Sequence, residues 1–412
     1  MAKKQYDVIL FGATGFTGRQ AAQYFADNVG STGLRWTIAG RNMDKLQAVK
    51  SQLGSAFADM QPIVADSFDF DSVTNMVKQT RVLLTTVGPY DLYGEPIVAA
   101  CVRHNTDYVD ITGENQFVRR IIDRYHVQAA QNGTRIIPFC GFDAVPSDIG
   151  TLMMVGHFRK QRKSTKQVKS FFQAKGGFNG GTVASAINLM RTGPMTALTD
   201  PIYLNPYDHA SEDERAHSQD NPWPAFDDDL KRWTAPYFMA PVNSRVVRRS
   251  NALFAKAGYA YGDTFLYSER MLVGGTAAPV TAGIISTTMK SVRLMGQSGR
   301  ILRAAYAMAP KGGTGPTEEQ MDSGFFKCKL IARDEDDNIA FGEVSNQGDP
   351  GNRSTVLMLC ESALTLALTP REKLPGGPRY GGVLTPATGL GPGLIIRLRD
   401  AGMTLSVGSE PT

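Results

Sequence analysis

Apolar and mixed segments alternate regularly along the first 145 residues of the chain. Strands buried on both faces are apolar throughout, and parallel strands need helical connections. The pattern therefore predicts an α/β fold, a doubly wound parallel sheet with helices on both faces. The apolar runs are 6–11, 35–39, 61–65, 81–87, 108–111 and 135–139, and the helical segments are 17–28, 44–53, 70–79, 95–104 and 115–131.

The regular alternation ends near Pro146. Candidate strands follow at 167–174, 245–247 and 325–332, while 203–237, rich in Asp, Pro and His, is typical of a long loop or lid. Helices are expected at 352–368 and 393–401. We divide the chain into a sheet domain at 1–145, a mixed α+β domain at 146–345 and a C-terminal helical segment at 346–412.

Composition narrows the class of function. The chain has 412 residues, 42% of them hydrophobic, which is enough for two domains with their own cores. Its net charge of +5 comes without aromatic residues among the basic runs, which favours anionic small molecules or a membrane surface over nucleic acid. The four cysteines and five histidines show no metal-ligand spacing, so we expect no metal. No signal peptide precedes the first strand, which predicts a cytoplasmic protein.

The segment 271–289 carries no charge and lies between Arg270 and Lys290. Glycines, a proline and threonines interrupt it, whereas a membrane-spanning helix needs about 20 mostly apolar residues. Two interpretations stay open. The segment packs inside the second domain, or it lines an acyl groove or touches a bilayer.

A glycine-rich turn, Gly12-Ala-Thr-Gly15-Phe-Thr-Gly18, follows the first expected strand and opens the first helix. The first glycine permits a tight turn, the second admits a diphosphate close to the backbone, and the third lets helix and strand pack closely. The helix N-terminus then offers N–H groups to phosphate. The turn predicts a dinucleotide site formed by Gly12, Thr14, Gly15, Phe16, Thr17 and Gly18. The alternative is an ordinary glycine-rich connection.

Arg41 follows the second strand, where NAD enzymes usually carry an acid for the ribose 2′-hydroxyl. A guanidinium instead suits a 2′-phosphate, which predicts NADP(H) as the cofactor. Asp66 after the third strand is a candidate partner of the adenine, or else a helix cap. Val87, Gly88 and Pro89 leave the fourth strand, where the nicotinamide ribose is expected to lie.

Tyr90, Tyr108 and Asp143 are the candidate catalytic residues, because they follow or end strands at the edge where ligands bind. Tyr90 donates a proton or only shapes the wall of the site. Strand alternation places Tyr108 and Asp110 on the same side of their strand. Glu114 and Ser147 are further candidates, although each acid is also a plausible helix cap or loop anchor. A second glycine-rich stretch, 176–182, forms either a nest over ligand or a plain turn.

Two familiar catalytic patterns are absent from the sequence. It contains neither Tyr-x-x-x-Lys nor a G-x-S-x-G nucleophile elbow. Hydrolysis is therefore disfavoured. Hydride transfer needs only a positioned nicotinamide, a dry pocket and one proton source.

Further motifs follow the glycine-rich turn in a fixed order. With them the chain resembles, over nearly its whole length, the saccharopine-dehydrogenase-like oxidoreductases, in particular their trans-acting enoyl reductase branch. The motifs are Ala39-Gly-Arg41, Val87-Gly-Pro-Tyr90, Gly94-Glu-Pro96, Asp107-Tyr-Val-Asp110, Thr112-Gly-Glu114, 141–148 (GFDAVPSD), 348–351 (GDPG) and 382–386 (GVLTP).

The resemblance implies a Rossmann domain at 1–145 that binds NADP(H), an inserted α+β domain for substrate binding and dimerisation, and a C-terminal helix returning to the Rossmann domain. It implies an NADPH-dependent oxidoreductase, and some relatives act on lipids or are found at membranes. We expect a homodimer that reduces a C=C or C=O bond of a small apolar or lipid-linked substrate. Peripheral membrane contact is left open.

Two alternatives remain. One is a saccharopine-type reductase of an amino-acid imine. The carboxylates of such an imine require a clamp of arginine side chains. Arg191, Arg245, Arg248 and Arg249 are available for that clamp. The other is a non-catalytic NADP-binding protein at a membrane.

Overall fold

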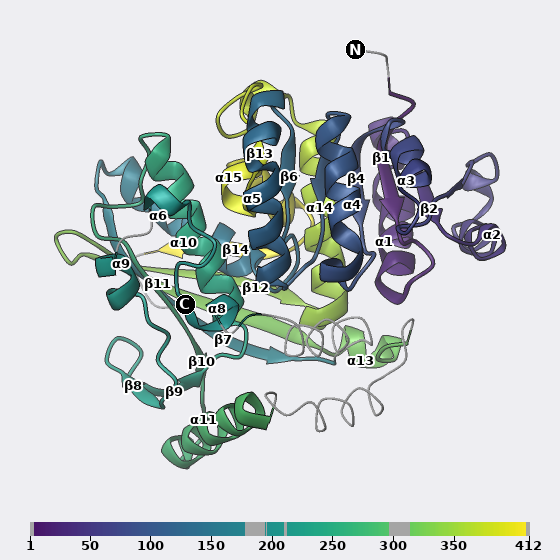
Figure 1. Ribbon diagram of the computed structural model, residues 1–412. Helices are drawn as coiled ribbons and strands as arrows, with labels where there is room; N and C mark the ends of the chain where they lie inside the picture. Colours follow the sequence, from purple (N-terminus) through teal and green to yellow (C-terminus); the bar gives the residue numbers. More distant parts are fainter. Residues whose placement is uncertain (1–3, 178–193, 195, 210–211, 296–313, 409–412) are drawn as a thin grey trace.

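Two sheets, one parallel and one mixed, organise the chain, and Figure 1 shows them one above the other. The computed structural model describes residues 4–177, 194, 196–209, 212–295 and 314–408. Within these residues each sheet has seven strands.

The first sheet, sheet A, has the strand order β13-β6-β5-β4-β1-β2-β3, and all its neighbouring strands are parallel. The order reverses direction between the central strands β1 and β4, as in a doubly wound Rossmann sheet. The predicted fold class is confirmed. The strands are β1 (Tyr6–Phe11), β2 (Trp36–Gly40), β3 (Ile63–Val64), β4 (Thr80–Thr85), β5 (Asp107–Val109), β6 (Arg135–Ile137) and β13 (Gly382–Val383).

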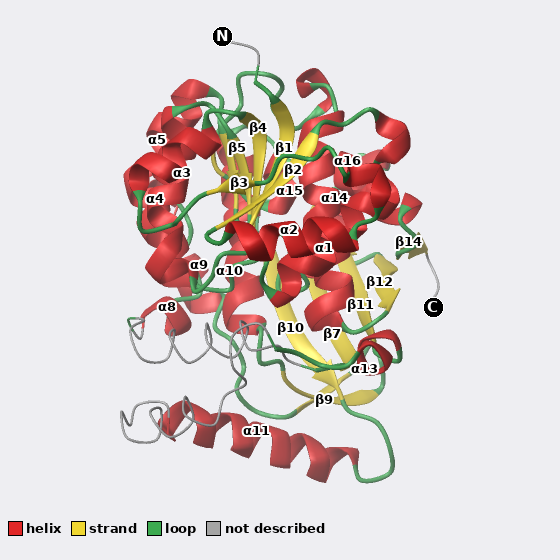
Figure 2. Cartoon of the chain, turned by 90° about the vertical axis from the view of Figure 1, so that its right-hand side faces the viewer, coloured by secondary structure: helices red, strands yellow, loops and turns green. Residues whose placement is uncertain are grey.

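Helices cover both faces of sheet A because its strands are apolar on both sides. Val8 and Leu10 share a core with Phe25 on one face, and Ile9 and Phe11 lie in a second core on the other. Figure 2 shows the two helix layers. One layer holds α1 (Phe16–Asn28), α2 (Met43–Gln52), α14 (Thr355–Leu368) and α16 (Pro392–Asp400), and the other holds α3 (Phe70–Val77), α4 (Tyr90–Arg103) and α5 (Asn115–Asn132).

The second sheet, sheet B, has the order β14-β12-β11-β7-β10-β9-β8. Only β7 and β10 are parallel, and the other pairs are antiparallel. α6 (Val145–Lys160) packs closely on it, since a Cβ at Gly150 would lie 3.0 Å from Leu330 of β11. The strands are β7 (Thr165–Lys175), β8 (Ala225–Asp227), β9 (Arg232–Pro236), β10 (Leu266–Leu272), β11 (Phe325–Asp334), β12 (Ile339–Gln347) and β14 (Thr404–Gly408).

Two expectations for the middle of the chain need correction. The strand expected at 245–247 is wrong, because these residues lie within α10 (Ala240–Lys256). Apolar side chains recur there at helical spacing, and a three-residue window cannot separate the two periods. The segment 203–237 is more than a loop, since it contains α9 (Glu212–His217), β8 and β9.

The remaining helical elements are short, except for α11. Figure 1 shows α11 at the end of the molecule beyond β9, far from sheet A. These elements are α8 (Thr196–Thr199), α11 (Ala278–Met295), α13 (Glu318–Asp322), α15 (Pro386–Gly389), a π-helical turn at Pro350–Ser354, and 3₁₀ turns at Gly30–Thr32, Ser55–Phe57, Tyr207–His209 and Arg371–Lys373.

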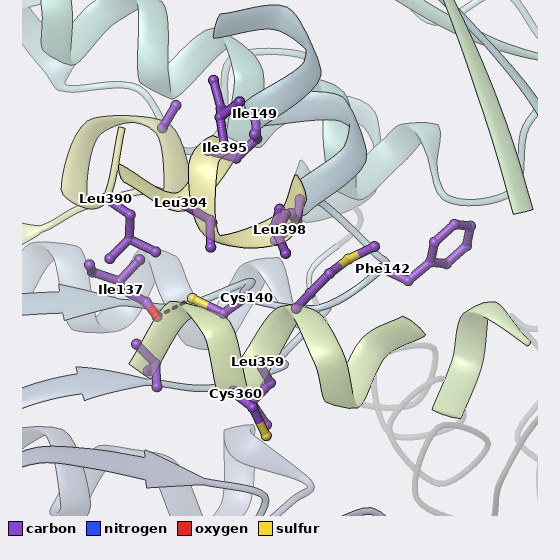
Figure 3. Close-up of a cluster of buried hydrophobic side chains, with 14 of the residues drawn as sticks. Ile137, Cys140, Phe142, Ile149, Leu359, Cys360, Leu390, Leu394, Ile395 and Leu398 are labelled. Carbon is purple, nitrogen blue, oxygen red and sulfur yellow. Dashed lines mark hydrogen bonds between the residues drawn. The ribbon is translucent and has the colours of Figure 1, made fainter. Parts of the chain in front are cut away.

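The C-terminal part of the chain connects the two sheets. β13 extends sheet A beside β6, and β14 forms an edge of sheet B beside β12. Glu361 of α14 accepts a hydrogen bond from Tyr24 of α1 at 2.7 Å and pairs with Arg397 of α16 at 2.7 Å. Leu394 and Leu398 of α16 face α14 in the core of Figure 3. Since this part contributes to both sheets, the three-part division stays a proposal.

Glu361 is buried, so its loss is expected to destabilise the fold. E361A leaves the Arg397 guanidinium and the Tyr24 hydroxyl without their shared partner, and we expect a drop in unfolding free energy of about 3 kcal/mol. Urea unfolding followed by circular dichroism measures this drop. The exposed Glu372 provides the control, and E372A should change the value by no more than about 0.5 kcal/mol. Equal losses in the two variants would contradict the prediction.

Candidate active site at the carboxyl edge of sheet A

The turn after β1 leaves no room for side chains at its first and last glycines. A Cβ at Gly18 would lie 2.1 Å from the carbonyl oxygen of Gly12. Gly12 itself has a φ of +95°, and a Cβ there would lie 2.7 Å from Oγ1 of Thr86 in the loop after β4. Helix α1 therefore begins in close contact with the end of β1, and the loops after β1 and β4 touch.

The N-terminus of α1 is open to an anion. Gly15 is its N-cap, no side chain caps it, and its first turn holds no acid. The first-turn N–H groups have no partner within the helix, and the helix dipole makes this end positive. Thr14, Phe16 and Thr17 line the turn and are half-buried. These residues fit the diphosphate of a dinucleotide.

Arg41 directly follows β2 at the same edge and is exposed. Among the described residues its guanidinium has no hydrogen bond or ion pair. The next residue, Asn42, caps α2 by accepting from Lys45 N at 2.9 Å. Arg41 thus lies at the sheet edge with its guanidinium available. The predicted contact with a 2′-phosphate requires such an available guanidinium.

Asp66 and the loop after β4 complete the expected cofactor residues. Oδ1 of Asp66 accepts from Phe68 N at 3.1 Å, and it is Asp69 that caps α3. The adenine contact of Asp66 stays a prediction. Val87 is half-buried and Gly88 is exposed, and Pro89, joined to Gly88 by a cis peptide bond, is the N-cap of α4.

Tyr90 and Tyr108 lie behind this edge, inside the core. The Tyr90 hydroxyl donates to Thr85 O at 3.1 Å, and the Tyr108 hydroxyl donates to Asp110 Oδ2 at 2.7 Å. The contact between Tyr108 and Asp110 confirms that they share one side of β5. Burial raises the pKa of both tyrosines and that of Asp110, the latter to about 7.

The two acids that follow β5, Asp110 and Glu114, anchor loops and cap a helix. Asp110 Oδ1 accepts from the backbone of Thr112 at 3.0 Å and of Phe139 at 3.2 Å. Glu114 accepts from Tyr90 N at 2.9 Å and from Asp91 N at 3.0 Å, so it caps α4 from a neighbouring loop. These contacts leave Asp143 as the acid available at the edge.

Asp143 follows β6 and is half-buried, without a hydrogen bond to any described residue. A Cβ on Gly113, in the loop after β5, would lie 3.6 Å from its Oδ2 and 3.9 Å from Cε of Met239. Burial raises the pKa of Asp143 to about 6. A carboxyl group whose pKa is close to neutral pH thus lies where two loops of sheet A meet the segment before α10.

An aromatic cluster from sheet B adjoins Asp143, and sequence analysis missed it. Phe142 packs against Phe172 of β7 and Phe326 of β11, with ring centroids 6.1 Å and 4.9 Å away. Phe172 stacks on Tyr237 at 4.4 Å, and Phe238 lies against Tyr237 at 5.0 Å. The only signal for this cluster in the sequence is the alternation of apolar and polar residues within the segments that form β7 and β11. The side chains packed beside the acid are therefore mostly apolar and buried, and only Phe238 among them is exposed.

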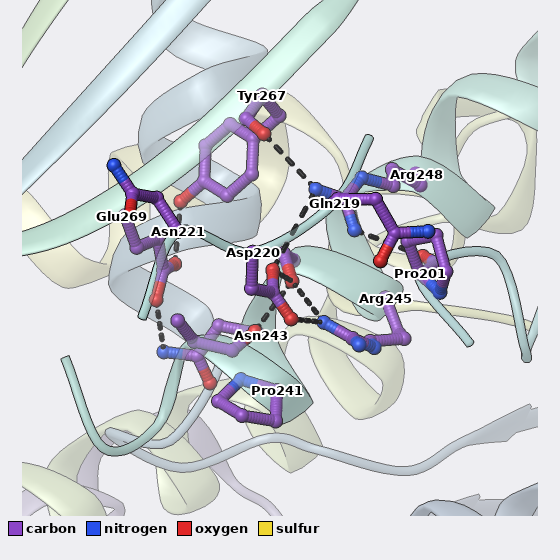
Figure 4. Close-up of polar contacts among 12 residues, drawn as sticks. Pro201, Gln219, Asp220, Asn221, Pro241, Asn243, Arg245, Arg248, Tyr267 and Glu269 are labelled. Atoms are coloured by element: carbon purple, nitrogen blue, oxygen red, sulfur yellow. Dashed lines mark hydrogen bonds and ion pairs between the residues drawn. The ribbon is translucent and has the colours of Figure 1, made fainter. Parts of the chain in front are cut away.

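The arginines proposed as a carboxylate clamp are already engaged. Arg245 of α10 pairs with Asp220, as Figure 4 shows. Arg248 donates to the carbonyl oxygens of Pro201 at 2.9 Å and Tyr267 at 3.1 Å. Arg249 donates to those of Leu204 at 2.5 Å and Val383 at 2.6 Å. All three are buried. Arg191, and the glycine-rich stretch beyond Gly177, lie outside the described residues.

Comparisons with known proteins agree with this geometry. Residues 8–137 match the NADP-binding domain of saccharopine dehydrogenase. The chain is 36% identical to a trans-acting enoyl reductase of Mycobacterium tuberculosis over 423 residues, 98% of each chain. The corresponding protein of Mycobacterium ulcerans is 34% identical over 427 residues, 98% of each chain.

The chain belongs to the trans-acting enoyl reductase family. This member of the family is an NADP-binding oxidoreductase. The solved saccharopine dehydrogenase (L-Glu forming) of Saccharomyces cerevisiae shares its fold, with a TM-score of 0.53 and 11% identity over 98% of this chain and 99% of that one. Homospermidine synthase of Legionella pneumophila, solved with NAD, also has a TM-score of 0.53, at 10% identity over 99% and 93% of the two chains.

Two features are absent from the described residues of this oxidoreductase. Its described part holds no group of three or more His, Cys, Asp or Glu side chains arranged for a metal. No described helix has both the length and the hydropathy required to cross a bilayer. The charge-free segment 271–289 instead divides between β10, a connection and α11.

Arg41 is expected to choose between the two nicotinamide coenzymes. R41A should weaken NADPH binding about 10- to 100-fold, the loss of one charge-assisted contact, and leave NADH binding unchanged. Titration of the fluorescence of each reduced coenzyme measures both affinities. NADH is the internal control, because it lacks the 2′-phosphate. Equal weakening for both coenzymes, or none for NADPH, would contradict the assignment.

Proposed function

We propose that this protein uses NADPH to reduce a C=C or C=O bond of an apolar or lipid-linked substrate bound between the two sheets. The observation that carries the proposal is an acid, Asp143, with a pKa of about 6 beside an aromatic cluster. The turn from Gly12 to Gly18 and Arg41 would hold the diphosphate and the 2′-phosphate. NADPH supplies the hydride when bound.

Asp143 is our proposed source of the proton that reduction also needs. Below its pKa of about 6 the carboxyl carries a proton, and its oxygens have no partner among the described residues. The surrounding aromatic rings exclude water and so keep the neutral acid favoured. Tyr90 and Tyr108 have buried, engaged hydroxyls, and in this proposal they hold the loops rather than donate the proton.

The same surroundings support an apolar substrate over an amino-acid imine. An imine with several carboxylates requires exposed cations, and the three described candidates on α10 are buried on carbonyl oxygens and Asp220. An unsaturated substrate with an acyl chain would instead gain from contact with Phe238, which is exposed and lies against the buried cluster.

The direct test is oxidation of NADPH, followed by absorbance, with unsaturated acyl thioesters, long-chain ketones and a dicarboxylic amino-acid imine. Turnover of a long-chain thioester or ketone, rising with chain length, is expected. Turnover of the imine alone would favour a saccharopine-type reductase. Tight NADPH binding without turnover of any of these compounds would favour a non-catalytic NADP-binding protein.

Asp143 makes the rate depend on pH. Burial raises its pKa, so the acid is protonated below about pH 6 and loses its proton as the pH rises. We expect kcat to fall about tenfold per unit above that pH. D143N should lower kcat about 100-fold and remove this dependence, with D228N at an exposed aspartate as the control. A wild-type rate that is constant to about pH 8 would contradict this role.

The exposed face of α11 supports two further proposals about partners. Val280 and Ile284, one helical turn apart, are 65% and 61% exposed. Apolar side chains at this spacing suit contact with a second copy of the chain, as in a homodimer, or with a bilayer surface. Size-exclusion chromatography and co-sedimentation with phospholipid vesicles distinguish the two.

A further inference from the structure

Tyr237 carries a buried hydroxyl that no described group satisfies. Its side chain is 4% exposed, and its hydroxyl oxygen has no hydrogen-bond partner among the described residues. A buried polar group without a partner is costly, and native proteins retain few of them. Most other buried tyrosine hydroxyls nearby are engaged, as Tyr267 shows by donating to Glu269 at 2.5 Å.

The position of Tyr237 relates this hydroxyl to the candidate active site. Tyr237 follows β9 of sheet B, and its carbonyl oxygen accepts from Ala240 N at 3.1 Å where α10 begins. Two residues further on, Met239 lies within reach of Gly113, as does Asp143. Burial raises the pKa of Tyr237, and the charges of Glu269 and Asp143 raise it further. The Tyr237 ring stacks on Phe172, which packs against Phe142, the residue before Asp143. Tyr237 thus belongs to the aromatic cluster that adjoins Asp143 and lies on the sheet B side of it.

The aromatic rings fix the direction of the phenol. Tyr237 and Phe172 are stacked with an angle of 8° between their planes, so the Tyr237 ring has little freedom to turn. Phe238 covers it from another side at 5.0 Å. A hydroxyl held in an apolar place is a strong donor toward a ligand oxygen, because water competes little for it.

We propose that the Tyr237 hydroxyl binds the carbonyl oxygen of the substrate by donating a hydrogen bond to it. This inference rests on the proposed function. Reduction of a C=O bond, or of a C=C bond conjugated to one, places negative charge on that oxygen, and a fixed donor stabilises the charge as it grows. Tyr237 keeps its proton throughout. The substrate is then a carbonyl compound held between an acid of sheet A and a donor of sheet B.

Y237F tests this role because it removes one oxygen and keeps the ring. Using trans-2-decenoyl-N-acetylcysteamine thioester and NADPH, we expect kcat to fall about 100-fold. NADPH affinity and the melting temperature should not fall, because the lost hydroxyl has no hydrogen-bond partner in the described part of the chain. Unchanged kcat with Y237F would overturn the inference, as would a fall in kcat that is matched by loss of the folded protein.

Y261F is the matched control. Tyr261 is equally buried, at 1% exposed, but its backbone lies beside Thr165 at the start of β7. Seven residues of extended strand, roughly 20 Å, separate that point from Phe172. Y261F should leave kcat within about twofold of wild type. A similar fall in both variants would show that buried phenols act through stability alone and would overturn the proposal.

A binding measurement separates this inference from the proposed function. Wild-type protein that binds the thioester without turning it over contradicts the proposed function only. In that case, the role of the Tyr237 hydroxyl is tested by calorimetric titration of the thioester into wild-type and Y237F protein saturated with NADP⁺. About tenfold weaker binding by Y237F supports the hydrogen bond, and equal affinity overturns it.

Discussion

The contact between Gly18 and the carbonyl oxygen of Gly12 is the constraint on which the site depends. It lets α1 start directly at the end of β1, with its first-turn N–H groups directed at the sheet edge. Any side chain at position 18 would move the helix away from the strand. The same tight turn brings the loop after β4 against Gly12, so the two loops that we propose hold the diphosphate and the nicotinamide are in contact.

The two sheets complete this surface together. β13 and β14 are close in sequence but belong to different sheets, and α10 is anchored by arginines that bind carbonyl oxygens from distant segments, including Val383 of β13. Such buried contacts hold sheet B at a fixed position relative to sheet A. An acid from one sheet and an aromatic cluster from the other thereby meet, which neither sheet provides alone.

Side chains at the edge divide into anchors and free groups. Asp110, Glu114, Tyr90 and Tyr108 are satisfied by nearby donors or acceptors, and they hold the loops in place. Asp143, Tyr237 and Arg41 lack such partners among the described residues. Satisfied groups stabilise a fold, whereas accessible or buried groups without partners are suited to a ligand. This distinction cannot be made from residue type.

The sequence by itself determined the Rossmann sheet, the glycine-rich turn and the arginine after β2. Each of these depends on residues close together in the chain, where period, glycine positions and strand–turn–helix order act locally. Tertiary structure decided the rest. It made 245–247 helical, turned the α10 arginines from a possible clamp into buried anchors, and brought the aromatic cluster that contains Tyr237 beside Asp143. These outcomes depend on packing between segments far apart in the sequence, and no local sequence pattern predicts that packing.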